Sequence, residues 1–219
     1  MASCSPLTNF TSSNAVTARA VNALASYYGG NLAGGNCMFA SYSLPPGIYG
    51  TALAGANWNS AAQCGGCLRV TGPWGNSIKV MVVDQCPGCA PNQLDLFQDA
   101  FSQIGPLDAS IININYETVS CDLNSPLFVR NKDGASKWWF SMQVFNANQP
   151  VTSLDVSTDG GKAWQTTIRR DYNYFERPSG GGFGTDAVTV RITCANGAQQ
   201  TLWNIGVDGW SWFTASGNC

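Results

Sequence analysis

The nine cysteines of this 219-residue chain are the feature that most limits the folds open to it. Two pairs have Cys-x-x-Cys spacing, as Cys64-Gly-Gly-Cys67 and Cys86-Pro-Gly-Cys89. This spacing fits a four-cysteine zinc site, and it also fits a framework of extracellular disulfides. With 24 Gly and only 11% charged residues, the composition is typical of a secreted β-rich globule, which favours disulfides. The odd number leaves one thiol over, and we assign it to Cys4.

The chain contains no histidine, and this excludes several functional classes. Ser-His-Asp and Cys-His nucleophile systems, the common His-ligated zinc sites and His-ligated haem all require that residue. The formal net charge of −2 argues against nucleic acid as the main partner, because phosphate binding requires a basic excess. No apolar run approaches the ~18 residues of a membrane span, so we expect no membrane partner.

The first residues do not have the pattern of a targeting signal. Residues 1–12 lack both the charged and the apolar region of a signal peptide, and we therefore expect a mature chain with an added Met1. Asn9-Phe10-Thr11 has the pattern of a glycosylation site, which has meaning only for a eukaryotic source.

Charge and tryptophan content divide the chain into two halves near Asp122-Leu-Asn-Ser-Pro126. The first half holds three bases and six acids, whereas the second half holds eight bases, seven acids and six of the eight Trp. We therefore predict one domain over 1–122 and another over 123–219.

Alternating apolar residues predict mainly strands in both halves. In the first half we expect strands at 68–70, 78–84 and 111–116, and one helix with apolar residues at Phe97, Phe101 and Ile104, which Gly105 ends. In the second half we expect a strand at 139–145 and two hairpins, 154–156 with 164–168 and 188–192 with 201–203. The chain is therefore expected to be all-β, with a β-sandwich in its second half.

Carboxylates are the main candidates for acid–base chemistry in a chain without histidine. No Asp or Glu occurs before residue 84. Asp84 ends an apolar strand, and Asp95 lies between two leucines just before the predicted helix. Each can face a cleft while its neighbours are buried. In the alternative interpretation, Asp95 caps the helix and Asp84 makes hydrogen bonds within a turn.

The adjacent pair Trp138-Trp139 is the candidate for a binding surface. In a single strand the two rings would lie on opposite faces, whereas a bulge would display both. Flat exposed aromatic rings bind sugar rings by stacking. The alternative is that all six Trp of the second half are core residues, and we expect Trp203, Trp210 and Trp212 in particular to be buried.

Several motifs together resemble those of microbial expansins. They span nearly the whole chain from about Ala25, in the same order as in that family: Cys64–Pro73 (CGGCLRVTGP), Val82–Ala90 (VVDQCPGCA), Leu94–Phe101 (LDLFQDAF) with Ile104-Gly105, Phe128–Trp139 (FVRNKDGASKWW) and Asp171–Phe175 (DYNYF).

This resemblance implies a six-stranded double-ψ β-barrel, similar to that of family 45 endoglucanases, followed by an immunoglobulin-like β-sandwich that resembles the family 63 carbohydrate-binding module. It also implies a secreted, extracellular monomer that binds cellulose and plant cell-wall glucans. Such a protein disrupts their non-covalent junctions without hydrolysis, and it requires no metal or organic cofactor.

The resemblance also implies roles for individual barrel residues. Asp95 matches the essential carboxylic acid, and Asp84 is its supporting carboxylate. Ser26 stands where expansins usually have Thr, and Tyr27 and Tyr28 are expected to line the same groove. A groove aromatic of the family, two residues after the strand Asp, is replaced here by Cys86.

On the sandwich, the resemblance implies an aromatic platform of Trp138, Trp139 and Tyr172, with Lys132 as a nearby polar contact. The disulfides Cys37–Cys64 and Cys67–Cys121 are expected as in the barrel of the plant relatives. We add Cys86–Cys89 as a local bridge and Cys194–Cys219 at the end of the sandwich.

The absence of early carboxylates argues against hydrolysis. The family 45 base would come from the strand around Ala25–Tyr27, where no Asp or Glu is present. An inverting glycosidase needs that second carboxyl to activate water, ~6.5–9.5 Å from the acid. We therefore expect a wall-loosening protein that is not an enzyme. The alternatives are an endoglucanase or lytic transglycosylase that uses Asp95, and a cellulose-binding module attached to an inert barrel.

Overall fold

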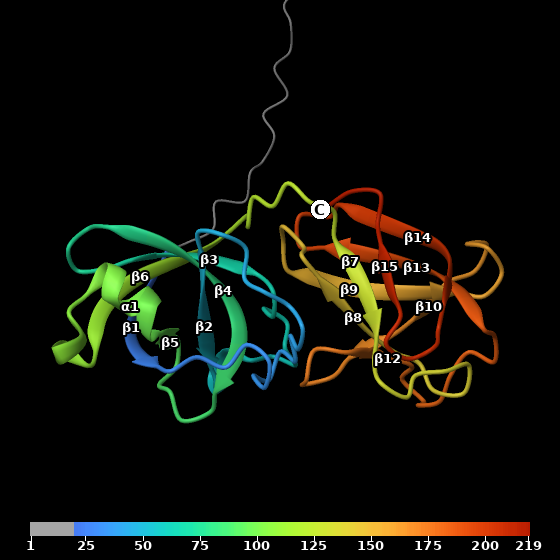
Figure 1. The fold of residues 1–219 in the computed structure, drawn as a ribbon, viewed down its shortest axis with the longest axis horizontal. Helices are drawn as coiled ribbons and strands as arrows, with labels where there is room; N and C mark the ends of the chain where they lie inside the picture. The colour runs from blue at the N-terminus through green and yellow to red at the C-terminus, as the bar shows by residue number, and fades with distance from the viewer. Residues whose placement is uncertain (1–19) are drawn as a thin grey trace, which may run out of the picture.

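The computed structural model describes residues 20–219, so Cys4 and Asn9 lie outside the described residues. The described chain is almost entirely β-structure, arranged as a closed barrel followed by two further sheets (Figure 1). The expected double-ψ β-barrel followed by an immunoglobulin-like β-sandwich is therefore confirmed. Within residues 20–219, no helix is long and apolar enough to cross a membrane.

The barrel closes in the strand order β1-β5-β2-β4-β3-β6. Strand β1 runs parallel to β5 and β2 runs parallel to β4, while the other neighbours are antiparallel. Its strands are β1 (Val21–Tyr28), β2 (Ile48–Ala54), β3 (Cys67–Thr71), β4 (Ser77–Cys86), β5 (Leu94–Phe97) and β6 (Ile112–Val119). Its helices are α1 (Gln98–Ile104) and the 3-10 turns η1 (Gly55–Asn57) and η2 (Leu107–Ala109).

Helix α1 covers one side of the barrel core. Ala100, Phe101 and Ile104 are fully buried against it, which confirms Phe101 and Ile104 of the predicted helix, whereas the third predicted residue, Phe97, ends β5 just before the helix and is half-buried. Gly105 ends the helix in an extended conformation, and its N–H donates to the Phe101 carbonyl. The C-terminus therefore needs no left-handed residue.

The sandwich consists of a four-stranded sheet in the order β10-β9-β13-β14 and a five-stranded sheet in the order β11-β12-β8-β7-β15. Both predicted hairpins form, because β9 pairs with β10 and β13 pairs with β14. The strands are β7 (Phe128–Asn131), β8 (Ser141–Phe145), β9 (Val151–Ser157), β10 (Gln165–Thr166), β11 (Ile168–Arg169), β12 (Phe175–Glu176), β13 (Ala187–Cys194), β14 (Gln199–Gly206) and β15 (Trp212–Thr214).

Four disulfides join the eight cysteines of the described chain. The pairs are Cys37–Cys64, Cys67–Cys121, Cys86–Cys89 and Cys194–Cys219, which are the pairs expected from the sequence. The two cysteines of the first Cys-x-x-Cys motif therefore have different and distant partners. The alternative four-cysteine zinc site does not form, because none of its sulfurs is a free thiolate.

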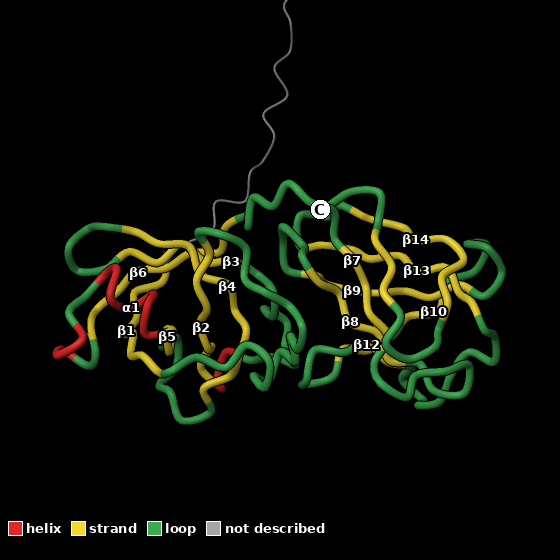
Figure 2. Tube along the Cα trace, viewed as in Figure 1, coloured by secondary structure: helices red, strands yellow, loops and turns green. Residues whose placement is uncertain are grey.

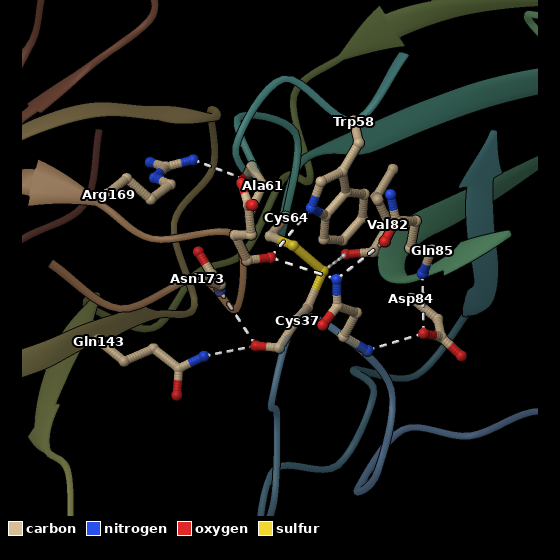
Figure 3. The surroundings of a disulfide bond; sticks show 12 residues. Cys37, Trp58, Ala61, Cys64, Val82, Asp84, Gln85, Gln143, Arg169 and Asn173 are labelled. Carbon is tan, nitrogen blue, oxygen red and sulfur yellow. Dashed lines mark hydrogen bonds between the residues drawn. A yellow bond between two sulfur atoms is a disulfide. The ribbon is translucent and has the colours of Figure 1, made fainter. Parts of the chain in front are cut away.

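Loops of the barrel pack against the outer face of the five-stranded sheet (Figure 2). Around the Cys37–Cys64 disulfide, the Cys37 carbonyl accepts hydrogen bonds from Gln143 Nε2 at 2.6 Å and Asn173 Nδ2 at 3.2 Å (Figure 3). Trp58 Nε1 donates to the Asp171 carbonyl at 2.9 Å. These are direct polar contacts between barrel and sandwich, and they hold the barrel loops against the sheet.

Candidate functional site

Strand register places the two candidate carboxylates in one row across the barrel. Ser26 of β1 is opposite Asp95 of β5, Asp95 is opposite Ala52 of β2, and Ala52 is opposite Asp84 of β4. Residues that face each other in neighbouring strands project to the same side of the sheet. Ala52 separates the two carboxylates and adds only a methyl group, so the row leaves space between them.

Asp95 is held by a short chain of hydrogen bonds. Ser26 Oγ donates to Asp95 Oδ1 at 2.7 Å, and Gln93 Nε2 donates to Ser26 Oγ at 2.9 Å. Helix α1 begins after Phe97 without a side-chain cap, so Asp95 does not cap it. The hydroxyl of Ser26 thus orients the carboxylate across 69 residues of sequence.

Asp84 is held more tightly, by backbone groups. Its Oδ1 accepts hydrogen bonds from the backbone N–H of Asn36 at 2.7 Å and of Gln85 at 2.8 Å. Gly35 makes this approach possible, because a Cβ there would lie 2.9 Å from Asp84 Cγ and 2.3 Å from a backbone oxygen. Asp84 is therefore a member of the row, and it also holds the loop that follows β1 in place.

Tyr28 connects the row to this loop. Its hydroxyl donates to Asp84 Oδ2 at 3.3 Å. Burial raises the pKa of Tyr28 well above its ordinary value of 10, and the charge of Asp84, its hydrogen bond and the charge of Asp95 raise it further. Tyr28 is thus a neutral hydrogen-bonding group in the field of both carboxylates.

Tyr27 is an exception among the groove residues that we expected. Alternation along β1 turns it away from Ser26 and Tyr28, and its ring packs at 4.8 Å from the Phe101 ring. Its hydroxyl donates to the Leu107 carbonyl at 3.1 Å. The structure thus places Tyr27 beside the barrel core, which corrects the expectation that it lines the groove.

The Cys86–Cys89 disulfide lies directly beside Asp95. Both sulfurs and a carboxylate oxygen of Asp95 lie within 4.8 Å of one another. Because the sulfurs are oxidised, only the carboxylate of this cluster is an ordinary metal ligand. The position where the family has an aromatic residue is thus occupied by a disulfide next to the row.

On the sandwich, Trp138 stands at the tip of a tight turn. Ser136 and Trp139 exchange two backbone hydrogen bonds of 2.9 and 3.0 Å, so Lys137 and Trp138 form the turn between them. Trp138 is 72% exposed, and Trp139 is half-buried. Strand β8 begins only at Ser141, so the prediction of a strand from 139 is wrong at its start.

Tyr172 and Lys132 lie close together on the same domain. Lys132 Nζ is 5.9 Å from the Tyr172 ring centre and 5.1 Å from that of Tyr174. The Tyr172 hydroxyl donates to Glu176 Oε1 at 2.7 Å, and burial together with this carboxylate raises the pKa of Tyr172 to about 12. The ring is thereby fixed at its polar end while it remains partly exposed.

One residue connects the barrel row to the sandwich surface. The backbone N–H of Asn36 donates to Asp84, and its side-chain Nδ2 donates to the Asp171 carbonyl at 3.2 Å. Asp171 directly precedes Tyr172 in the sequence. The carboxylate of Asp84 and the ring of Tyr172 are therefore both held at the junction between barrel and sandwich.

Three further Trp that we expected in the core are exposed. Trp203, Trp210 and Trp212 are 63%, 54% and 42% exposed, so that prediction is wrong. Trp210 and Trp212 lie over the guanidinium of Arg130, which is itself buried at the domain junction. Trp203 follows the buried Leu202 on β14, and alternation turns its side chain outward.

The chain resembles known proteins over most of its length. No model of a known protein family matches it. Expansin-YoaJ of Bacillus subtilis is 33% identical over 177 residues, which cover 79% of this chain and 73% of that protein. Expansin-like protein 3 of Dictyostelium discoideum is 28% identical over 156 residues, which cover 68% of this chain and 47% of that protein.

Solved structures agree with this result. The apo expansin of Clavibacter michiganensis is 30% identical, has a TM-score of 0.79, and covers 91% of this chain and 98% of its own. A mutant of that expansin in complex with cellohexaose gives a TM-score of 0.80 with the same identity and coverage. Sequence and architecture thus lead to the same family over both the barrel and the sandwich, and the chain belongs to the expansins, as one of the microbial type.

Proposed function

We propose that this protein is a secreted, non-hydrolytic wall-loosening protein, which binds cellulose and plant cell-wall glucans and disrupts their non-covalent junctions. The observation that carries the proposal is the arrangement at the domain junction. Asn36 hydrogen-bonds both to Asp84 of the carboxylate row on the barrel and to the carbonyl of Asp171, the residue before Tyr172 on the sandwich. One polysaccharide chain can therefore contact both domains.

The sandwich supplies affinity in this proposal. Trp138, Trp139 and Tyr172 form the platform, because Trp138 is exposed at a turn tip and the Tyr172 ring is fixed by its hydroxyl. Lys132 beside Tyr172 adds a polar contact for sugar hydroxyls. The expansin of Clavibacter michiganensis has been solved with cellohexaose, and this supports a β-glucan as the ligand here.

The barrel supplies the activity. Asp95, oriented by Ser26, hydrogen-bonds sugar hydroxyls of the bound chain and displaces it from its neighbours. Hydrolysis requires a base as well, and β1 brings a serine rather than a carboxylate to the position opposite Asp95. The binding energy thus loosens contacts between chains without breaking a glycosidic bond.

The spacing of the two carboxylates favours one rival function, an endoglucanase or lytic transglycosylase that uses Asp95. Asp84 and Asp95 are separated by one strand, so their Cα atoms are about 9–10 Å apart. This is close to the ~6.5–9.5 Å between the carboxyls of inverting glycosidases. However, Asp84 Oδ1 already accepts two backbone hydrogen bonds, which leaves it poorly placed to activate water.

The remaining features complete the proposal. Four disulfides fit an oxidising, extracellular compartment. We take residues 1–122 as the barrel domain and 123–219 as the binding domain of a monomer. The proposed action requires no metal, organic cofactor, nucleic acid or membrane.

Two measurements on the same polymer test this function. The creep of a clamped plant-wall strip under constant load reports loosening, and a reducing-sugar assay reports hydrolysis. We expect creep without new reducing ends at any pH. Reducing ends that disappear with Asp95→Asn would establish the hydrolytic rival, and binding without creep would leave a cellulose-binding module with an inert barrel.

A further inference from the structure

A surface hollow of about 770 Å³ lies on the barrel beyond Asp95. It lies over strands β1, β3 and β6 and the loop before β5, and Figure 1 shows β1 and β6 on the side of the barrel away from the sandwich. Its wall mixes the polar side chains of Asn22, Thr71, Gln93, Asn113 and Asn115 with apolar side chains such as Leu24 and with glycines.

Strand register brings the asparagines of the hollow together. Asn22 of β1 is opposite Asn115 of β6, and Asn115 is opposite Thr71 of β3. Leu24 and Asn113 form the next pair along the same two strands. Side chains two residues apart project to the same face, so these groups share one surface.

The amides of this surface have the hydrogen-bonding capacity to bind a ligand. Among the described residues, the side chains of Asn22, Asn113 and Asn115 have no hydrogen-bond partner within the protein. Each carries two donor hydrogens and one acceptor oxygen, which is the capacity that binds hydroxyl groups. Asparagine is depleted in strands, so three on one paired surface are not explained by strand stability.

The wall of the hollow also restricts the charge of a ligand. No Asp, Glu, Lys or Arg is among the residues that line it in the described structure. An anion or a cation would lose its hydration there without gaining a countercharge. A neutral ligand with many hydroxyl groups fits the wall better.

The hollow continues the carboxylate row. Gln93 lines it and donates to Ser26 Oγ, which in turn donates to Asp95. At the far rim, Trp74 lies between Pro73 and Gly75, which both line the hollow, and it is 63% exposed. An exposed aromatic residue thus stands beside a surface of mixed polarity that adjoins Asp95 through Gln93 and Ser26.

We propose that this hollow is a further binding subsite for an uncharged β-glucan, in which the amides of Asn22, Asn113 and Asn115 bind sugar hydroxyls. The inference rests on the proposed function, because the ligand is the same chain that crosses Asp95. A glucan chain that is bound on both sides of Asp95, at the hollow and at the sandwich platform, cannot slide along the barrel. Contacts with Asp95 can then displace it from its neighbouring glucan chains.

Nuclear magnetic resonance of the full chain tests the subsite directly. A soluble mixed-linkage β-glucan oligosaccharide is titrated while the side-chain NH₂ signals of the asparagines are followed. We expect the signals of Asn113 and Asn115 to shift with the same saturation curve as signals of the platform. Polygalacturonate, a polyanion, is expected to leave them unmoved because the wall carries no countercharge.

A variant measures the contribution to affinity. Asn113→Ala with Asn115→Ala is expected to lower the affinity for a mixed-linkage glucan polymer about tenfold, since each hydrogen bond contributes modestly. The control is Gln165→Ala, which removes an exposed amide from β10 on the far sheet and should bind like the wild type.

The outcomes separate the two proposals. If the wild type binds the glucan while the asparagine signals stay still and the double variant binds equally well, the subsite is overturned and the proposed function stands. If polygalacturonate moves the asparagine signals and the glucan does not, the proposed ligand is wrong. If the wild type binds no glucan, the proposed function fails and the subsite fails with it.

Discussion

Two exposed tryptophans on opposite sheets of the sandwich allow a matched test of the platform. Trp138 is 72% exposed beside the five-stranded sheet, and Trp203 is 63% exposed on β14 of the four-stranded sheet. Trp138→Ala should weaken binding to crystalline cellulose, whereas Trp203→Ala should not. Both variants remove the same type of side chain, so a difference between them reports position rather than chemistry.

The structure sets the size of each effect. A fully buried Trp side chain covers about 250 Å², so Trp138 buries roughly 70 Å² and Trp203 roughly 90 Å². At about 25 cal/mol per Å², each truncation lowers the free energy of unfolding by at most about 2 kcal/mol. A sugar ring that covers half of the exposed Trp138 surface, about 90 Å², contributes about 2 kcal/mol to binding, which corresponds to a loss of affinity of roughly thirtyfold.

Depletion of the protein from solution by crystalline cellulose measures the affinity, and thermal unfolding measures the stability. We expect melting temperatures within a few degrees of each other and a clear difference in depletion. Equal loss of binding in both variants would show that the platform is not the surface that binds. Unfolding of Trp138→Ala alone would show that its ring supports the core.

Three further predictions concern the barrel. Asp95→Asn should abolish creep while cellulose binding persists, because Asn keeps the size of the side chain but cannot ionise; unchanged creep would reduce Asp95 to a scaffold residue. Loss of the Cys67–Cys121 disulfide, whose cysteines are 54 residues apart in the sequence, should lower the free energy of unfolding by about 4 kcal/mol. Loss of Cys86–Cys89, whose cysteines are 3 residues apart, should lower it by only about 2 kcal/mol, and a denaturant titration that gave the reverse order would contradict this chain-entropy argument. Burial raises the pKa of Tyr42 to about 12, so its contribution to stability is complete below pH 10 and is lost as the pH rises through 12; alkaline unfolding curves of wild type and Tyr42→Phe that coincide would refute this.

Local pattern predicted much of the fold. The alternation at 78–84 and 188–192 gave strands, and Asn196-Gly197 gave the hairpin between β13 and β14, because these signals depend only on neighbouring residues. The start of β8 was missed because Trp139 closes a tight turn with Ser136, and alternating apolar residues cannot reveal such a backbone contact.

The candidate site was predictable only in part. The positions of Asp84 and Asp95 in a chain without histidine made them candidates, and the resemblance implied their roles. Their common row, however, depends on pairing between β1, β5, β2 and β4, which are distant in the sequence. The exposure of Trp203 was missed because a large apolar side chain is usually buried. Its side chain points outward because the neighbouring Leu202 of β14 points into the sandwich core.

The buried Arg130 limits how the sandwich can be exchanged between proteins. Its guanidinium lies 4.9 Å from the rings of both Phe145 and Trp212, and it donates to the Ala40 carbonyl of the barrel at 2.6 Å. A gene fusion that moved 123–219 alone would uncover this cation and its aromatic neighbours, and an uncovered patch of that kind promotes aggregation. Barrel and sandwich are thus expected to be inherited as one unit, unlike modules on flexible linkers that are shuffled freely among enzymes.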